Sequence, residues 1–115
     1  MNRTVAKRNK KSSAVVPKNS NMNPGKPLSV FFANIRQDGR ISSTHIGVFA
    51  ALLQYRMEKG FTNPIKAYSH QIMPLAKISA LRTYCRCLRD MDAYGYLRYI
   101  PSKKKTVPST IFFIE

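Results

Sequence analysis

The chain has 115 residues, of which 43% are apolar, so it can form one small domain with a modest core. Its formal charge of +15 at pH 7 favours a polyanionic partner, with nucleic acid ahead of a membrane surface. Two cysteines are too few for a disulfide scaffold, and no apolar run approaches transmembrane length. We therefore expect a reduced, cytoplasmic protein and no membrane partner.

The N-terminal segment differs in composition from the rest. Residues 1–26 hold seven of the 20 basic residues and no acidic or aromatic residue. Because no helical period appears there, we expect residues 1–27 to form a disordered basic tail. Thirteen basic and all five acidic residues follow Lys26, which leaves a charge of +8. The predicted folded domain, residues 28–115, is therefore basic without its tail and can present a fixed phosphate-binding surface.

The domain is expected to open with a short β-prone segment and then a helix. Residues 30–32 read Val-Phe-Phe, which fits a short strand or a docking arm. Ser43 supplies an N-cap for the first helix, and Gly60 is placed to end it. The apolar residues that recur at helical spacing are Ile46, Phe49, Leu53 and Met57.

Two further helices and a hairpin complete the predicted order. After a very short strand at residues 65–67, Ser69 can cap a second helix, which Pro74 should kink or shorten. Ser79 can cap a third helix that ends at Gly95. Two β-prone runs then flank a tip rich in Lys and Pro, which predicts a β-hairpin.

The third predicted helix has a cationic side and an apolar side. At about 100° per residue, Arg82, Arg86 and Arg89 fall within roughly 60° of one another. The residues expected on the opposite, buried side are Leu81, Tyr84, Leu88 and Met91. This helix can therefore bury one side and present three guanidinium groups to a polyanion.

The two cysteines of this helix do not read as a metal or redox site. Cys85 and Cys87 point about 160° from each other on a helix, and they lack the two-residue gap of a zinc or redox pair. His45 and His70 have no partner pattern and are expected at the surface. We expect Cys87 to flank the core, Cys85 to flank the arginines, and neither a metal nor a cofactor to bind.

Catalysis finds little support in the sequence. The five carboxylates are scattered, and Asp90 and Asp92 diverge on a helix, so no acid and base pair is evident. No Gly-rich phosphate loop or nucleophile elbow appears. We therefore do not expect an enzyme.

The order of predicted elements points to a DNA-binding arrangement. A capped helix, a short helix, a turn, an arginine-faced helix and a hairpin with Lys103, Lys104 and Lys105 at its tip follow one another. This is the plan of a winged helix-turn-helix, whose third helix enters the major groove of DNA while the wing lies along the backbone or minor groove. The predicted fold is mainly α, with three helices and a two- or three-stranded wing.

The chain also resembles a known family. SALRTYCRCLRDMDAYGYL, residues 79–97, is similar to the recognition helix and first wing strand of bacterial winged-helix transcription regulators. More closely, RISSTHIGVFAALLQYRMEKGFTNPI and LAKISALRTYCRCLRDMDAYGYLRY resemble small regulator-like proteins of bacterial conjugative transposons and related mobile elements. The resemblance covers roughly residues 31–102. It departs at Pro74 and at the glycine-free tip SKKKTVPS.

The resemblance implies specific residue roles. Ser79, Arg82, Thr83 and Arg86 match positions that face DNA in winged-helix regulators. Arg82 and Arg86 are the candidates for base edges, because a guanidinium can bond guanine in bidentate fashion.

The remaining basic residues are expected to bind DNA without reading its sequence. Arg89 lies further from the N-terminus of the helix and is expected to contact phosphate. Lys103, Lys104 and Lys105 are expected to do the same from the tip of the wing.

These observations predict sequence-specific binding of double-stranded DNA by a transcriptional regulator or accessory factor of a mobile genetic element, associated with the nucleoid. One alternative is an RNA-binding or ribosome-associated basic protein. Another is an architectural protein-interaction module of a DNA transfer or replication complex. A homodimer is a further arrangement to consider, which a palindromic DNA site would reveal.

Overall fold

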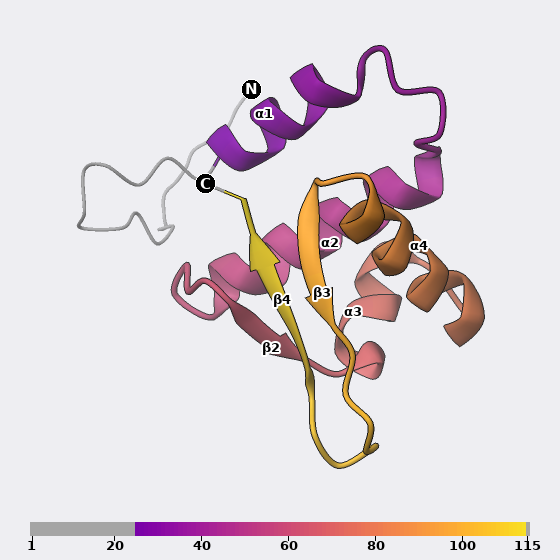
Figure 1. Cartoon of the computed structure of the whole chain (residues 1–115). Helices are drawn as coiled ribbons and strands as arrows, with labels where there is room; N and C mark the ends of the chain where they lie inside the picture. Colours follow the sequence, from indigo (N-terminus) through magenta and orange to yellow (C-terminus); the bar gives the residue numbers. More distant parts are fainter. Residues whose placement is uncertain (1–24, 115) are drawn as a thin grey trace, which may run out of the picture.

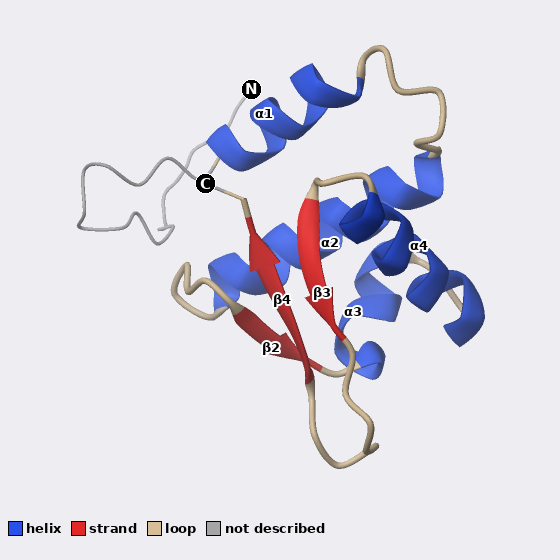
Figure 2. Cartoon of the chain, in the orientation of Figure 1, coloured by secondary structure: helices blue, strands red, loops and turns tan. Residues whose placement is uncertain are grey.

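The computed structural model describes residues 25–114, which form four helices and a three-stranded antiparallel sheet (Figures 1 and 2). The elements in chain order are α1 (Lys26–Ile35), α2 (Ser43–Glu58), β2 (Ile65–Ala67), α3 (Ser69–Ala76), α4 (Leu81–Ala93), β3 (Leu97–Ile100) and β4 (Ser109–Phe113). Most of the predicted tail, residues 1–24, lies outside the described range. The first helix begins at Lys26, within the last two residues of that predicted tail.

Residues 30–32 belong to helix α1, so the predicted strand or docking arm is wrong there, and the domain has four helices where three were expected. Pro27 lies in the first turn, where its missing N–H costs nothing. Phe31 is 3% exposed, and its ring stacks on that of Phe49 in α2 with centroids 3.9 Å apart. This tertiary contact outweighs the β propensity of the Val-Phe-Phe run.

Helix α2 is capped by Ser42 rather than by the predicted Ser43. Ser42 Oγ accepts a hydrogen bond from the His45 backbone N–H, and His45 Nδ1 accepts one from the Ser42 backbone N–H at 3.0 Å. This reciprocal pair uses a histidine where Glu or Gln is usual, which the sequence pattern did not reveal. Gly60 follows the helix with φ +84°, as predicted, whereas Met57 is 40% exposed and lies off the core.

The sheet is ordered β2-β4-β3, and both pairings are antiparallel. Ile111 in the central strand β4 is opposite Ile65 of β2 and Tyr99 of β3, so these three buried side chains share one face of the sheet. The predicted short strand at residues 65–67 and the predicted hairpin are both confirmed. Gly95, with φ +88°, turns the chain from α4 into β3.

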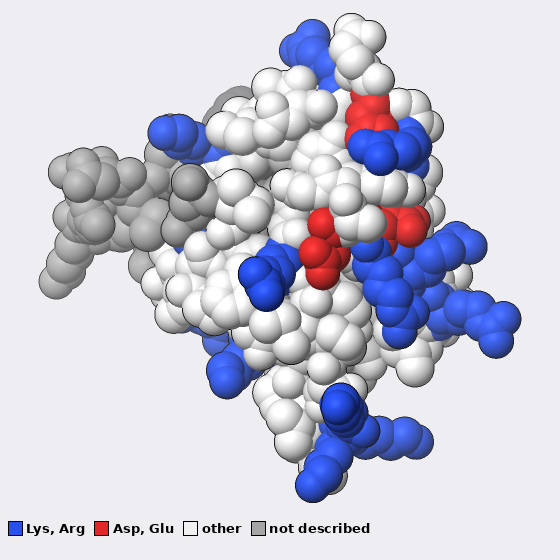
Figure 3. Space-filling view, in the orientation of Figure 1, with Lys and Arg blue, Asp and Glu red and all other residues white. Residues whose placement is uncertain are grey.

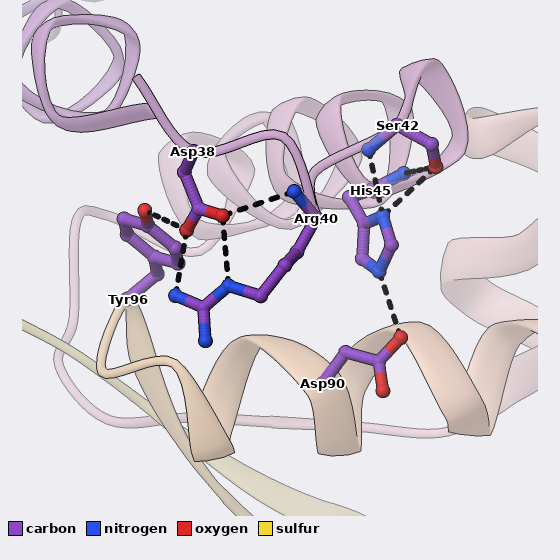
Figure 4. Close-up of polar contacts among 6 residues, drawn as sticks. All are labelled: Asp38, Arg40, Ser42, His45, Asp90 and Tyr96. Carbon is purple, nitrogen blue, oxygen red and sulfur yellow. Dashed lines mark hydrogen bonds and ion pairs between the residues drawn. The ribbon is translucent and has the colours of Figure 1, made fainter. Parts of the chain in front are cut away.

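A polar cluster fixes the loop between α1 and α2 against the start of β3 (Figure 4). The Asp38 carboxylate accepts hydrogen bonds from the Arg40 guanidinium at 2.8 and 2.9 Å and from the Tyr96 hydroxyl at 2.6 Å. The bond from Arg40, followed by that from Tyr96, holds the pKa of Asp38 well below its ordinary value. Arg40 also lies over the Tyr94 ring, 3.8 Å from its centroid.

His45 is buried, at 7% exposure, so the prediction that it lies at the surface is wrong. Its Nδ1 accepts the Ser42 backbone N–H, so the ring proton is on Nε2, which donates to Asp90 Oδ2 at 2.9 Å (Figure 4). This bond joins the first turn of α2 to α4, the arginine-bearing helix.

Candidate nucleic-acid interface

Helix α4 presents its arginines outward because its other side is packed into the core. Tyr84, Cys87, Leu88 and Met91 are buried. Burial raises the pKa of the Tyr84 hydroxyl and of the Cys87 thiol, so both groups stay neutral packing residues. Leu81 was predicted on this side but is 54% exposed, because it lies over a groove at the edge of the core.

The three arginines of α4 form an exposed cationic surface, here called the arginine stripe (Arg82, Arg86 and Arg89). None of the three side chains makes a hydrogen bond or ion pair with any residue in the range 25–114. The two carboxylates of this helix are engaged elsewhere: Asp90 binds His45, and Asp92 accepts the Tyr99 backbone N–H at 3.2 Å. No carboxylate within residues 25–114 therefore forms an ion pair with the stripe.

Ser79 does not cap α4, contrary to prediction. The helix begins at Leu81, Ala80 occupies the N-cap position, and the Ala80 carbonyl accepts the Tyr84 N–H at 3.2 Å. Lys77 ends α3 in the left-handed conformation, and the chain needs the next residues to turn into α4. Ser79 is therefore an exposed turn residue, while Thr83 is half-buried in the first turn of α4.

The loop between β3 and β4, residues 101–108 (the hairpin loop), has a defined conformation. The Ser102 hydroxyl donates to the Lys104 carbonyl at 2.6 Å and accepts the Lys104 N–H at 3.1 Å. The Tyr68 hydroxyl, at the start of α3, donates to the Thr106 carbonyl at 2.9 Å. The exposed side chains at the tip, which make no ion pair within the described range, are those of Lys103, Lys104 and Lys105.

A space-filling view shows Lys and Arg gathered over α4 and again over the hairpin loop (Figure 3). A groove of about 390 Å³ lies against both α4 and the hairpin loop. It is bordered by the start of α3, the first half of α4 and the hairpin loop, including all three lysines of the tip. The predicted lysines thus line a groove together with Leu81, Tyr84 and Cys85 of α4, the helix that bears the stripe, and no arginine lines it.

The groove also contains residues that sequence reasoning missed. Tyr68 and His70 lie along it, with their rings stacked at 5.2 Å between centroids and 10° between planes. His70 is exposed, as predicted, but its place beside Tyr68 and the hairpin loop was not foreseen. Leu81 and Cys85 of α4 line the same groove. These side chains come from separate elements, so no local pattern could have grouped them.

Other basic side chains of the domain make contacts within the protein. Arg56 is 3% exposed, and its Nε donates to the Thr62 carbonyl at 2.9 Å. Its guanidinium lies 5.0 Å from the Phe113 ring centroid. Arg40 is held by Asp38. Net charge alone therefore overstates the cations that can reach a ligand.

Within residues 25–114 no three His, Cys, Asp or Glu side chains come close enough to hold a metal ion. Cys85 is half-buried and Cys87 is buried, and both are free thiols. No helix in this range combines the length and the apolar character needed to cross a membrane.

No protein-family model, curated protein or solved structure matches the chain. The resemblance to mobile-element proteins therefore stays a prediction.

Proposed function

We propose that the protein is a winged helix-turn-helix protein that binds double-stranded DNA. In this proposal α2, α3 and α4 are the three helices of the motif, α4 enters the major groove, and the β3–β4 hairpin is the wing. The observation that carries the proposal is the arginine stripe, whose side chains are exposed and make no hydrogen bond or ion pair among residues 25–114. It lies on α4, the helix that lines one groove together with the lysines of the hairpin loop.

The position of each arginine along α4 decides which part of the DNA it contacts. Arg82 and Arg86 lie in the first half of the helix, the part that contacts base edges when such a helix enters the major groove. Either guanidinium can donate two hydrogen bonds to guanine, so these two residues supply the sequence preference. Arg89, in the second half of the helix, supplies a phosphate contact.

The remaining contacts go to the DNA backbone. Lys103, Lys104 and Lys105 bind phosphates from the wing regardless of sequence. The Ser79 hydroxyl is exposed in the turn before α4, since it is not used as a cap, and it donates to a phosphate oxygen. Thr83, half-buried, contributes a second hydroxyl at the start of the helix.

The biological role that fits these contacts is that of a transcriptional regulator or accessory factor of a mobile genetic element. Both roles are compatible with a small protein that recognises one duplex sequence.

The test is a comparison of Arg86→Ala with Arg98→Ala. Arg98 is also an exposed arginine without an ion pair in the described range, but it lies on β3. A preferred duplex is first selected from a random pool, and binding of each variant is then measured by fluorescence anisotropy. Arg86→Ala should weaken binding to this duplex by about 1–3 kcal/mol and relax the sequence preference of the protein at one position of the site. Arg98→Ala should leave the affinity and the sequence preference nearly unchanged.

Binding to a structured RNA is measured in the same way. Equal loss of affinity for the selected duplex in both variants would refute the assignment of α4 as the recognition helix. Tighter binding to the RNA than to any duplex would replace the proposal with an RNA-binding role.

A further inference from the structure

We propose that the groove between α3, α4 and the hairpin loop binds an unpaired nucleotide, with its base against the Tyr68–His70 ring pair and its phosphate on the lysines of the loop. This site lies beside the arginine stripe and shares no arginine with it. The inference does not rest on duplex binding.

The stacked rings provide the surface for a base. Tyr68 is anchored at both ends: its backbone N–H donates to Gln71 Oε1 at 2.9 Å, and its hydroxyl donates to the Thr106 carbonyl at 2.9 Å. The His70 ring lies nearly parallel to it, and His70 is exposed. Aromatic side chains held in this way stack on any base, because every base has a π face.

The charge around the groove selects an anion. Lys103, Lys104 and Lys105 border it, and none of its lining residues is acidic. Its volume of about 390 Å³ falls within the range of about 300–1,000 Å³ usual for small-molecule sites. Leu81, which is 54% exposed, gives the groove an apolar wall of the kind that contacts a sugar or base. An aromatic base joined to a phosphate satisfies all of these features together.

A nucleotide within a duplex does not fit the ring pair in the same way. A paired base presents only its edge in either groove, since its two faces are covered by the neighbouring base pairs. Stacking on Tyr68 or His70 therefore requires a base outside the helix, as at a single-stranded end or in a free nucleotide.

The experiment compares two fluorescein-labelled single strands of equal charge, one of about ten thymidines and one with abasic residues in place of the bases. The full chain is titrated with each at about 0.2 M salt, a concentration that weakens phosphate contacts made by charge alone. The wild type should bind the thymidine strand at least about fivefold more tightly than the abasic strand. His70→Ala should lose this preference, whereas His70→Phe, which keeps a ring, should retain it.

The preference for bases is the quantity that decides the proposal. Equal affinity of the wild type for the two strands, or an unchanged preference in His70→Ala, overturns it. Thymidine monophosphate is then added as a competitor: displacement of the strand supports the site with a free nucleotide as ligand, and undisturbed binding supports it with a strand end.

Duplex binding is measured for the same proteins. If the wild type shows no preference for the thymidine strand but Arg86→Ala still weakens duplex binding, only the groove proposal is refuted. If the wild type prefers the thymidine strand but Arg86→Ala does not change duplex binding, only the duplex proposal is refuted.

Discussion

Replacing Lys103, Lys104 and Lys105 together by glutamine should change how duplex binding depends on salt. The three side chains are exposed at the tip of the hairpin loop and have no ion pair within residues 25–114. Glutamine keeps a polar side chain of similar length but removes the charge. The loop conformation should survive, because it is held by the Ser102 hydroxyl and the Tyr68 hydroxyl rather than by the lysine side chains.

The size of the effect follows from counterion release. Each phosphate neutralised on B-form DNA contributes about 0.9 to the slope of log affinity against log salt, so three contacts contribute about 2.7. The advantage of the wild type over the triple variant should therefore shrink about sixfold for each doubling of salt. Because phosphates carry no sequence information, the loss should be the same for selected and random duplexes.

The assay is fluorescence anisotropy with the selected and the random duplex at four or more salt concentrations. The control is Lys59→Gln combined with Lys66→Gln, two exposed lysines at the end of α2 and on β2. An equal change of slope per lysine in control and triple variant would show that charge alone acts and would refute the wing contact. A loss confined to the selected duplex would refute the assignment of these lysines to phosphates.

Two predictions concern the scaffold that holds the interface. Asp38→Asn should lower the free energy of unfolding at neutral pH and flatten its decline in acid, as measured by urea unfolding between about pH 7 and pH 2. The pKa of Asp38 is held below its ordinary value, chiefly by Arg40, so its contribution is present above that ordinary value, about 3.9, and is lost as pH falls through the folded pKa. A variant whose difference from the wild type stays constant down to pH 2 would contradict this sign. Phe31→Ala should lower the free energy of unfolding by about 3–5 kcal/mol, because the ring is buried against Phe49, whereas Phe32→Ala, on the exposed side of α1, should cost well under 1 kcal/mol. Equal losses in the two variants would show that α1 is not docked through Phe31.

Local sequence patterns predicted several features of residues 60–114, although the N-caps of α3 and α4 are Tyr68 and Ala80 and not the predicted Ser69 and Ser79. Gly60 and Gly95 marked the ends of α2 and α4, since each has the positive φ that glycine adopts readily. Helical spacing was enough to predict that Arg82, Arg86 and Arg89 share an exposed side, because residues three and four apart lie on one face of a helix. The hairpin followed from two β-prone runs around a polar tip.

The errors occurred where a distant contact outweighed a local preference. A β-prone Val-Phe-Phe run became helical because Phe31 found Phe49, eighteen positions later, as a stacking partner. His45 had no local partner pattern, yet it is buried because it meets Asp90 from another helix. Ser79 was a good cap by residue type, but the turn after Lys77 delays the start of α4.

The composition and periodicity of the chain determined that it is a basic protein with an arginine-faced helix and a lysine-tipped hairpin. Only the tertiary structure decided that the lysine-tipped hairpin and the arginine-bearing helix line one groove, and that Tyr68 and His70 lie in it. Periodicity reports which residues of one element share a face. It carries no information on which elements meet, because that choice depends on the burial of side chains from the whole chain at once.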